Sequence, residues 1–402
     1  MKTSGRAGRG RIAPYVDFAS PILVMHWGRL GGGPRFAVSM YKALRESWAG
    51  GVLTSFNRTA EIMNQTGEDI ANGLPVTTYD RPIGLVLGIP KLVVLGFSLR
   101  KFIRRNGVKT VYSAMTSVWQ AVCTAVFLPA DVVFVASIHD AVEHPGEQHW
   151  VLRLCRRLDV GRADVIATYS QSARLILESQ IPPGGVPIID VPFGADAPAV
   201  TPRSIEARGS RPITLGFVGR IVEYKGIDLF AQTVRLLADA GMHVRGIVAG
   251  RGEVSAELVE STHDIIDWQI GWIPESELAH VLNQIDVLVL PYREASQSGV
   301  YSLALSAGLP TVATPVGGLV EQVGASGGVL AATVSALALA DAVRELTIPQ
   351  RYAETSRKCL AAAAGSNSWG NAARQLGTEL AQISADEAGL KAPDGWGLGR
   401  GR

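Results

Sequence analysis

The stretch ITLGFVGRIVEYKGIDLFAQTVRLLADAGMHVRGIVAGRGE, residues Ile213–Glu253, decides the fold of this chain. It begins with an uninterrupted apolar run, Ile213–Val218, which predicts a buried strand that ends at Gly219. An amphipathic pattern starts after Gly226 and predicts a helix, and a second apolar run, Val244–Ala249, predicts another strand. Strand, helix and strand in this order form a parallel βαβ unit.

Two cations, Arg220 and Lys225, lie between the first predicted strand and the helix. Free amides and the dipole at a helix amino terminus favour anions, and open α/β sheets bind ligands at the carboxyl ends of their strands. This arrangement predicts a site for a diphosphate. The alternative is that both cations are surface residues of an ordinary strand–helix loop.

The segment GFVGRIVEYKGID resembles the G-R-x-x-x-x-K-G loop of the family-four retaining glycosyltransferases, which have the GT-B fold and use nucleotide sugars. The resemblance covers about residues 21–384 and is clearest in the second half. It implies an α/β protein with two Rossmann-like, doubly wound domains facing across a cleft, and a carboxyl-terminal helix that crosses back to the amino-terminal domain. It also implies that Arg220 and Lys225 hold and neutralise the donor diphosphate beside Gly219.

The length of 402 residues suggests two or three domains. A segment rich in Pro, Ser, Arg and Gly without an apolar period marks the predicted boundary between them. The expected parts are a disordered tail (1–20), an amino-terminal acceptor domain (21–194), a linker (195–211), a nucleotide-sugar donor domain (212–366), a crossing helix (367–384) and a second disordered tail (385–402).

The amino-terminal half alternates predicted strands and helices. The strands are expected at Pro21–His26, Gly51–Phe56, Val76–Tyr79, Val108–Tyr112, Val132–Ile138, Val165–Thr168 and Val186–Val191. The helices are expected at Leu85–Arg105, Val118–Phe127, Gln148–Arg162 and Gln171–Ser179. Because the strands are almost continuously apolar, they predict a parallel sheet that is covered on both faces.

Two loops of this half resemble functional loops of the same family. The triple glycine of WGRLGGGPRF resembles its first glycine-rich loop, which implies that Gly32 and Gly33 face the donor phosphate across the cleft. The segment SIHDAVEHPGE resembles the region where a His contacts the sugar near its anomeric centre, a role that falls to His139. Asp140 and His144 are then expected on the acceptor side. The alternatives are that His139 is a hydrogen-bonded core residue and that His144 only orders its loop.

The segment REASQSGVYSLALSAGLPTVATPVGGLVEQV predicts a helix over Ser298–Ser306, whose first amides, at Ser298, Gly299 and Val300, are available to an anion. It resembles the family's E-x7-E region followed by G-x-P-V-V-A-T-x-x-G-G. The preceding turn, Gly271–Ile273, resembles the one that reads the nucleotide base through backbone groups, which implies that role for Ile273.

The two glutamates of the E-x7-E pattern do not match. Counting back from Pro310 aligns the first with Ala295 and the second with Leu303. Glu294 replaces the first only if the turn gains one residue, and the second, which normally bonds the ribose hydroxyls, has no counterpart. Ribose recognition is therefore expected to differ from the family pattern.

Composition indicates the cellular compartment and the partners to expect. Three cysteines lack metal-ligand spacing, and no signal peptide is visible, so we expect a reducing cytoplasm and no metal or other cofactor. Residues 1–200 contain 21 Lys and Arg against 15 Asp and Glu, an excess of positive charge in the amino half. Basic and apolar residues mix in Leu99–Lys109 and Trp150–Asp164, which predicts either peripheral contact with the inner face of an anionic membrane or a solvated face.

Together these features predict a retaining glycosyltransferase that moves a sugar from a nucleoside diphosphate sugar to a hydroxyl of a glycan or lipid-linked acceptor, in glycan, polysaccharide or glycolipid synthesis. Two other classes stay open: a nucleotide-sugar epimerase of similar fold, and a non-catalytic relative that binds nucleotide sugars. No nucleic-acid partner is expected. A nicotinamide dehydrogenase is not expected, since no G-x-G-x-x-G follows a strand.

Overall fold

The computed structural model describes residues 15–64, 72–79, 88–142, 150–182, 184–197 and 200–388. His144, most of the two predicted tails and the first residues of two predicted helices lie outside these ranges. Residues 15–20, assigned to the first tail from the sequence, are packed on the protein instead. Val16 is buried, and its amide donates a hydrogen bond of 3.0 Å to the Ser384 hydroxyl.

Two six-stranded sheets form the centres of two α/β layers, and every strand pairing in them is parallel. The first sheet has the order β2-β1-β3-β4-β5-β6. Its strands are β1 (Ile22–His26), β2 (Val52–Phe56), β3 (Thr110–Ser113), β4 (Val133–Ser137), β5 (Val165–Thr168) and β6 (Ile188–Asp190). Apolar clusters on both of its faces are buried, as near-continuous apolar strands require.

The helices of the amino-terminal domain are α1 (Gly32–Ser47), α3 (Ile89–Arg105), α4 (Val118–Phe127), α5 (Trp150–Arg162) and α6 (Gln171–Gln180). The predicted strand at Val76–Tyr79 is wrong. The chain there makes only isolated bridges, from Thr54 to Gly73 and from Asn57 to Val76. Beyond Val76 the two segments are joined by a side chain instead, since the Asn57 side-chain amide donates to the Thr78 hydroxyl at 2.7 Å.

The second sheet has the order β12-β11-β10-β7-β8-β9. Its strands are β7 (Ile213–Val218), β8 (Val244–Gly250), β9 (Ile266–Ile270), β10 (Val287–Leu290), β11 (Thr311–Ala313) and β12 (Val329–Leu330). The helices of this domain are α7 (Ile227–Asp239), α8 (Ala256–Thr262), α9 (Leu278–Asn283), α10 (Gly299–Ser306), α11 (Gly318–Ala325), α12 (Ala336–Leu346) and α13 (Pro349–Ala364). The expected βαβ unit is thus β7-α7-β8.

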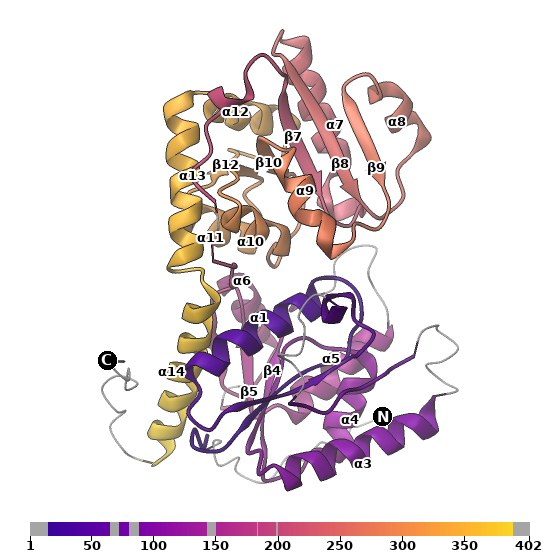
Figure 1. The fold of residues 1–402 in the computed structure, drawn as a ribbon, viewed down its shortest axis with the longest axis vertical. Helices are drawn as coiled ribbons and strands as arrows, with labels where there is room; N and C mark the ends of the chain where they lie inside the picture. Colours follow the sequence, from indigo (N-terminus) through magenta and orange to yellow (C-terminus); the bar gives the residue numbers. More distant parts are fainter. Residues whose placement is uncertain are drawn as a thin grey trace.

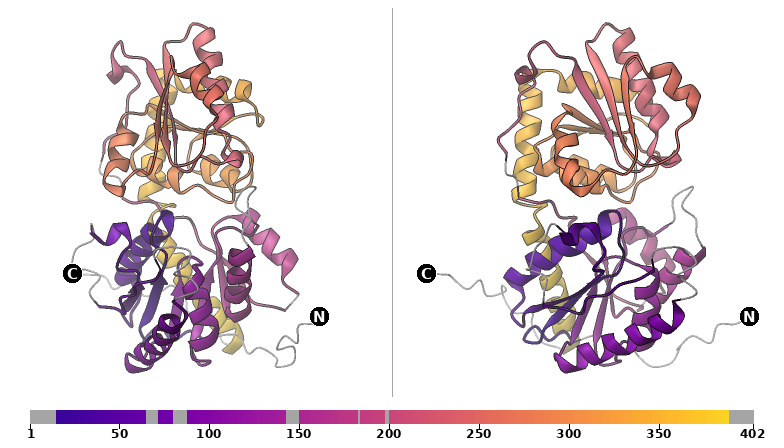
Figure 2. Two further views of the ribbon diagram at one scale, coloured as in Figure 1. Left: turned by 90° about the vertical axis from the view of Figure 1, so that its right-hand side faces the viewer. Right: turned by 45° about the vertical axis from the view of Figure 1, so that its right-hand side comes forward.

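The last helix, α14 (Trp369–Ala388), connects the two domains. Figure 1 shows α13 running along the carboxyl-terminal domain and α14 continuing beside the amino-terminal domain, where it packs against α1. Its buried residues Ala372, Leu376 and Leu380 belong to the same apolar cluster as α1 and β1. The two further views in Figure 2 show the two α/β bodies facing each other end to end. The predicted fold class, two Rossmann-like domains with a helix that crosses back, is confirmed.

Candidate active site

A cavity of about 370 Å³ lies between the two domains and is lined by residues of both. It brings together ten of the thirteen residues predicted for the site. These are Gly32, His139, Asp140, Gly219, Arg220, Lys225, Ile273, Ser298, Gly299 and Val300. Of the other three, Gly33 and Glu294 do not line it, and His144 lies outside the described residues.

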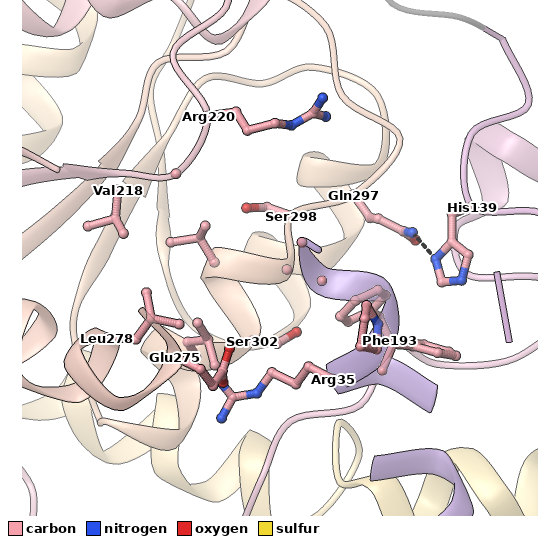
Figure 3. Close-up of a pocket in the computed structure, with 18 of the residues that line it drawn as sticks. Arg35, His139, Phe193, Val218, Arg220, Glu275, Leu278, Gln297, Ser298 and Ser302 are labelled. Carbon is pink, nitrogen blue, oxygen red and sulfur yellow. Dashed lines mark hydrogen bonds and ion pairs between the residues drawn. The ribbon is translucent and has the colours of Figure 1, made fainter. Parts of the chain in front are cut away.

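The loop after β7 places two cations at the cavity. Gly219 has a φ of +120°, and a Cβ on the facing Gly250 would lie 1.7 Å from the Gly219 carbonyl oxygen, so both positions require glycine. The Lys225 ammonium lies 3.3 Å from the Tyr292 hydroxyl and 4.9 Å from the centre of its ring. Arg220 is exposed in the cavity wall, and Figure 3 shows it on the carboxyl-terminal side, opposite the amino-terminal domain.

An ion pair between Arg293 and Asp228 supports this loop. The Arg293 guanidinium donates two hydrogen bonds, of 2.9 and 2.6 Å, to the Asp228 carboxylate. It also donates to the Glu223 carbonyl, while the Arg293 amide donates to the Tyr224 carbonyl at 2.7 Å. The turn that carries Lys225 is therefore tied to the loop after β10.

The amino terminus of α10 points its first turn at the cavity, but one of the three predicted amides is occupied. The Ser298 amide donates to the Gln322 side-chain oxygen at 2.8 Å, and Gln322 donates back to the Ser298 carbonyl at 3.1 Å. The Ser298 hydroxyl caps the helix by accepting from the Tyr301 amide. Among the described residues no acceptor lies on the amides of Gly299 and Val300, so these two remain for an anion.

His139 follows β4 and is buried between aromatic rings at the cavity edge. Its ring stacks on Tyr169 with a centroid distance of 4.4 Å and meets the edge of Phe36 at 4.7 Å. The Nε2 atom lies 2.9 Å from the Ala114 carbonyl oxygen, and Nδ1 lies 2.6 Å from the side-chain nitrogen of Gln297 in the opposite domain. Burial lowers the pKa of His139, so the ring is neutral near pH 7.

The glycine loop before α1 approaches this site through backbone. Gly31 has a φ of +81° and Gly32 lines the cavity. Gly33 is instead buried against His26. The packing is so close that a Cβ at Gly33 would lie 2.6 Å from the His26 Nε2 atom. Burial lowers the pKa of His26 to about 4. The third glycine therefore packs against the end of β1 and does not line the cavity.

Several cavity residues were not predicted from the sequence, and they join the two domains. Arg35 forms ion pairs with Asp196 of the linker and with Glu275 of the carboxyl-terminal domain. Glu61 accepts hydrogen bonds from the Glu275 amide at 2.8 Å and from the Trp272 ring nitrogen at 3.0 Å. No local pattern identifies these residues, since each partner lies more than 150 residues away in the chain.

Glu294 does not lie at the cavity position that aligns with the first glutamate of the family pattern. Glu294 is exposed outside the cavity, whereas Ala295 and Leu303, the positions that align with the two glutamates, both line it. Beside Leu303, the buried hydroxyl of Ser302 lines the cavity and has no hydrogen-bond partner among the described residues. Ser302 is the polar group nearest in sequence to the missing second glutamate.

Within the described part of the chain, no group of three His, Cys, Asp or Glu side chains is arranged to hold a metal ion. The three cysteines are buried and unpaired. No helix in the same residues is both long enough and apolar enough to cross a bilayer.

Comparison with known families identifies the second half of the chain. The family model for glycosyl transferases group 1 matches residues 212–347, which contain both cations and the start of α10. Residues 212–347 are thus similar to the glycosyl transferases of group 1. The chain is 30% identical over 217 residues to the 2-deoxystreptamine glucosyltransferase of Streptomyces kanamyceticus. The aligned residues cover 50% of this chain and 52% of that protein.

A second relative extends the similarity into the amino-terminal half of the chain. The D-inositol 3-phosphate glycosyltransferase of Corynebacterium aurimucosum is 24% identical over 282 residues, which span 65% of each chain. This chain thus spans about half to two thirds of the length of these relatives.

Solved structures are similar to almost the whole chain. Anabaena HepE in complex with UDP-glucose superposes with a TM-score of 0.68 at 15% identity, covering 90% of this chain and 99% of that one. Sucrose-phosphate synthase from Thermosynechococcus elongatus gives 0.67 at 18% identity, with coverage of 91% and 100%. These similarities extend over both α/β bodies, so the chain has the GT-B fold.

Proposed function

We propose that this protein is a retaining glycosyltransferase that moves a sugar from a nucleoside diphosphate sugar to a hydroxyl of a glycan or lipid-linked acceptor. The observation that carries the proposal is the convergence of Arg220, Lys225 and two unoccupied amides of α10 on one interdomain cavity. The group 1 family match and a GT-B neighbour that contains UDP-glucose support a nucleotide-sugar donor.

The chemistry follows from charge. When the anomeric C–O bond of the donor breaks, negative charge grows on the departing diphosphate. The guanidinium of Arg220, the ammonium of Lys225 and the amides of Gly299 and Val300 stabilise that charge, which lowers the barrier without a metal ion. In a retaining reaction the acceptor hydroxyl attacks on the face that the diphosphate leaves. The proton of the acceptor hydroxyl then passes to the leaving phosphate oxygen, so the reaction needs no other base.

The test of this proposal is the Arg220→Ala variant. Screening UDP-, GDP- and ADP-sugars by thermal shift first identifies the donor, since a ligand that binds the folded state raises the melting temperature. Loss of one transition-state charge partner is expected to lower turnover about 100-fold while the variant still folds. Unchanged turnover in a folded Arg220→Ala variant would refute the assignment. A changed sugar released without an acceptor would indicate an epimerase, and binding without turnover or hydrolysis a sensor.

We also propose that helix α3 makes peripheral contact with an anionic membrane at the cytoplasmic face. Val94 and Phe97 on α3 are 64% and 60% exposed, and Val126 on α4 is 65% exposed. Arg100 and Lys101, one turn further along α3, are also exposed. Exposed apolar side chains next to cations suit an interface with anionic lipid headgroups. Figure 1 places α3 at the end of the amino-terminal domain that lies away from the carboxyl-terminal domain.

Vesicle sedimentation tests the membrane contact. The protein is expected to bind vesicles of phosphatidylcholine and phosphatidylglycerol. The Val94→Ser/Phe97→Ser variant is expected to bind them at least tenfold more weakly, because it lacks the two apolar side chains that would be buried in the lipid. Leu337→Ser is the matched control, since Leu337 is 61% exposed but lies on α12 of the other domain. Equal binding of all three proteins would show that α3 does not contact the lipid.

A further inference from the structure

Gln297 carries an unused hydrogen-bond acceptor in the cavity wall. It lies immediately before the α10 cap, and its side-chain nitrogen is 2.6 Å from Nδ1 of His139 across the domain gap (Figure 3). Its side-chain oxygen is buried and has no partner among the described residues. A buried acceptor without a partner costs free energy, which a ligand donor recovers when it binds.

The position of the proton on His139 decides which end of the Gln297 amide is free. The Ala114 carbonyl, 2.9 Å from Nε2, can only accept, so Nε2 carries the hydrogen. Because the buried ring is neutral, Nδ1 is then an acceptor. The group of Gln297 that faces Nδ1 must therefore be the NH2 group, which leaves the carbonyl oxygen for the cavity.

The chemistry of the free oxygen selects one part of the donor. Diphosphate oxygens carry no hydrogen near pH 7, so they cannot donate to Gln297. Figure 3 shows Gln297 reaching toward His139 of the amino-terminal domain, whereas Leu278 lies on the opposite side of the cavity. The base is expected on the Leu278 side, near Ile273, so the sugar lies beyond the diphosphate, on the side of Gln297.

We propose that the side-chain oxygen of Gln297 accepts a hydrogen bond from one hydroxyl of the donor sugar, and that His139 is a positioning residue that holds the Gln297 amide. The inference rests on the proposed function. It differs from the role that the family resemblance implies for His139, since both ring nitrogens of His139 already have partners. Tyr169 and Phe36 fix the ring, and the ring fixes the amide.

Calorimetry with the donor and its parts tests the proposal. Gln297→Met, which keeps the side-chain length but has no acceptor, is expected to bind the nucleoside diphosphate (UDP, GDP or ADP) as the unchanged protein does. Its Kd for the matching nucleotide sugar is expected to rise about tenfold, since one hydrogen bond is lost. His139→Ala is expected to give a similar rise, and the double variant no further one, because the two residues act through a single contact. Gln269→Met, on β9 and outside the cavity, is the control.

Monodeoxy donors identify the hydroxyl. The unchanged protein is expected to bind one of them about tenfold more weakly than the parent donor, whereas Gln297→Met binds the two equally. If the ratio of each deoxy donor to its parent is the same in both proteins, Gln297 does not contact the sugar. If the variant fails to fold, the unchanged protein alone still gives a test. Equal affinity of the unchanged protein for the parent donor and for every deoxy donor would also overturn the inference. Absence of binding by every nucleoside diphosphate would refute the proposed function itself.

Discussion

At the scale of single residues, two buried polar atoms that lack partners belong to residues that line the cavity. Besides Gln297, the Ser302 hydroxyl is buried in the wall without a hydrogen-bond partner in the described chain. A stable fold normally pairs such groups, so their presence in a cavity indicates that the ligand completes them. Sequence alone predicted the cations because a motif carries them. It could not predict Ser302, since a Ser on an apolar helix has many ordinary roles.

The Ser302→Ala substitution separates a ligand contact from a structural one. The free protein is expected to keep or slightly raise its melting temperature, because the hydroxyl bonds nothing there. Affinity for the nucleoside diphosphate is expected to fall by about 1 kcal/mol, or about fivefold in Kd, if Ser302 takes part in ribose recognition in place of the absent glutamate. Thermal unfolding and calorimetry measure the two effects. A less stable free protein with unchanged affinity would assign Ser302 to packing.

At the scale of elements, apolar periodicity predicted most strands and helices within one to three residues, for example α4 over Val118–Phe127 and β5 over Val165–Thr168. Burial on both faces makes this signal strong. Caps were less predictable. The short helix α9 begins after the 3-10 turn Glu275–Glu277, and its cap residue, Glu277, makes no side-chain capping hydrogen bond. Likewise the Ser298 amide is occupied by Gln322 from α11, a contact between elements that no local pattern contains.

Helix α5 contains a buried carboxyl that predicts a pH-dependent stability. Burial raises the pKa of Asp159 to about 7, although a hydrogen bond of 2.7 Å from Thr116 opposes the shift. Between about pH 4 and 7 the unfolded chain releases this proton and the folded chain keeps it. This group therefore stabilises the fold at low pH and loses that contribution as pH rises, by at most about 1.4 kcal/mol per pH unit.

The Asp159→Asn variant should lack this slope, because an amide does not titrate in this range. The unfolding free energy of Asp159→Asn minus that of the unchanged protein is expected to increase from pH 4.5 to 7.5, as measured by urea denaturation. Asp264→Asn is the control without a slope in this range, since the ion pair with Arg235 lowers the pKa of Asp264 and its carboxyl is ionised in both the folded and the unfolded chain. A difference for Asp159→Asn that does not vary with pH would show that this carboxyl is ionised in the folded protein.

At the scale of the whole molecule, the relative placement of the two domains depends on contacts between distant residues. The crossing helix α14 was expected from the family resemblance, and the linker from its composition. The bridges at the cavity were not, because Glu61 meets Trp272 and Glu275 more than 200 residues further along the chain. Arg35, in the first turn of α1, joins the same cluster by pairing with Glu275. These contacts bridge the two domains at the cavity wall beside Glu275.

The Arg35→Ala/Glu61→Ala variant tests whether the bridges keep the cleft closed. Removing the two ion pairs of Arg35 and the two hydrogen bonds of Glu61 is expected to let the domains separate, so small-angle X-ray scattering should show a larger radius of gyration than for the unchanged protein. Adding the nucleotide sugar is expected to restore the smaller value, since a ligand bound by both domains favours the closed state. Arg235→Ala is the matched control, because its ion pair with Asp264 lies within one domain. If the double variant keeps its radius without ligand, α14 and the linker alone set the closure.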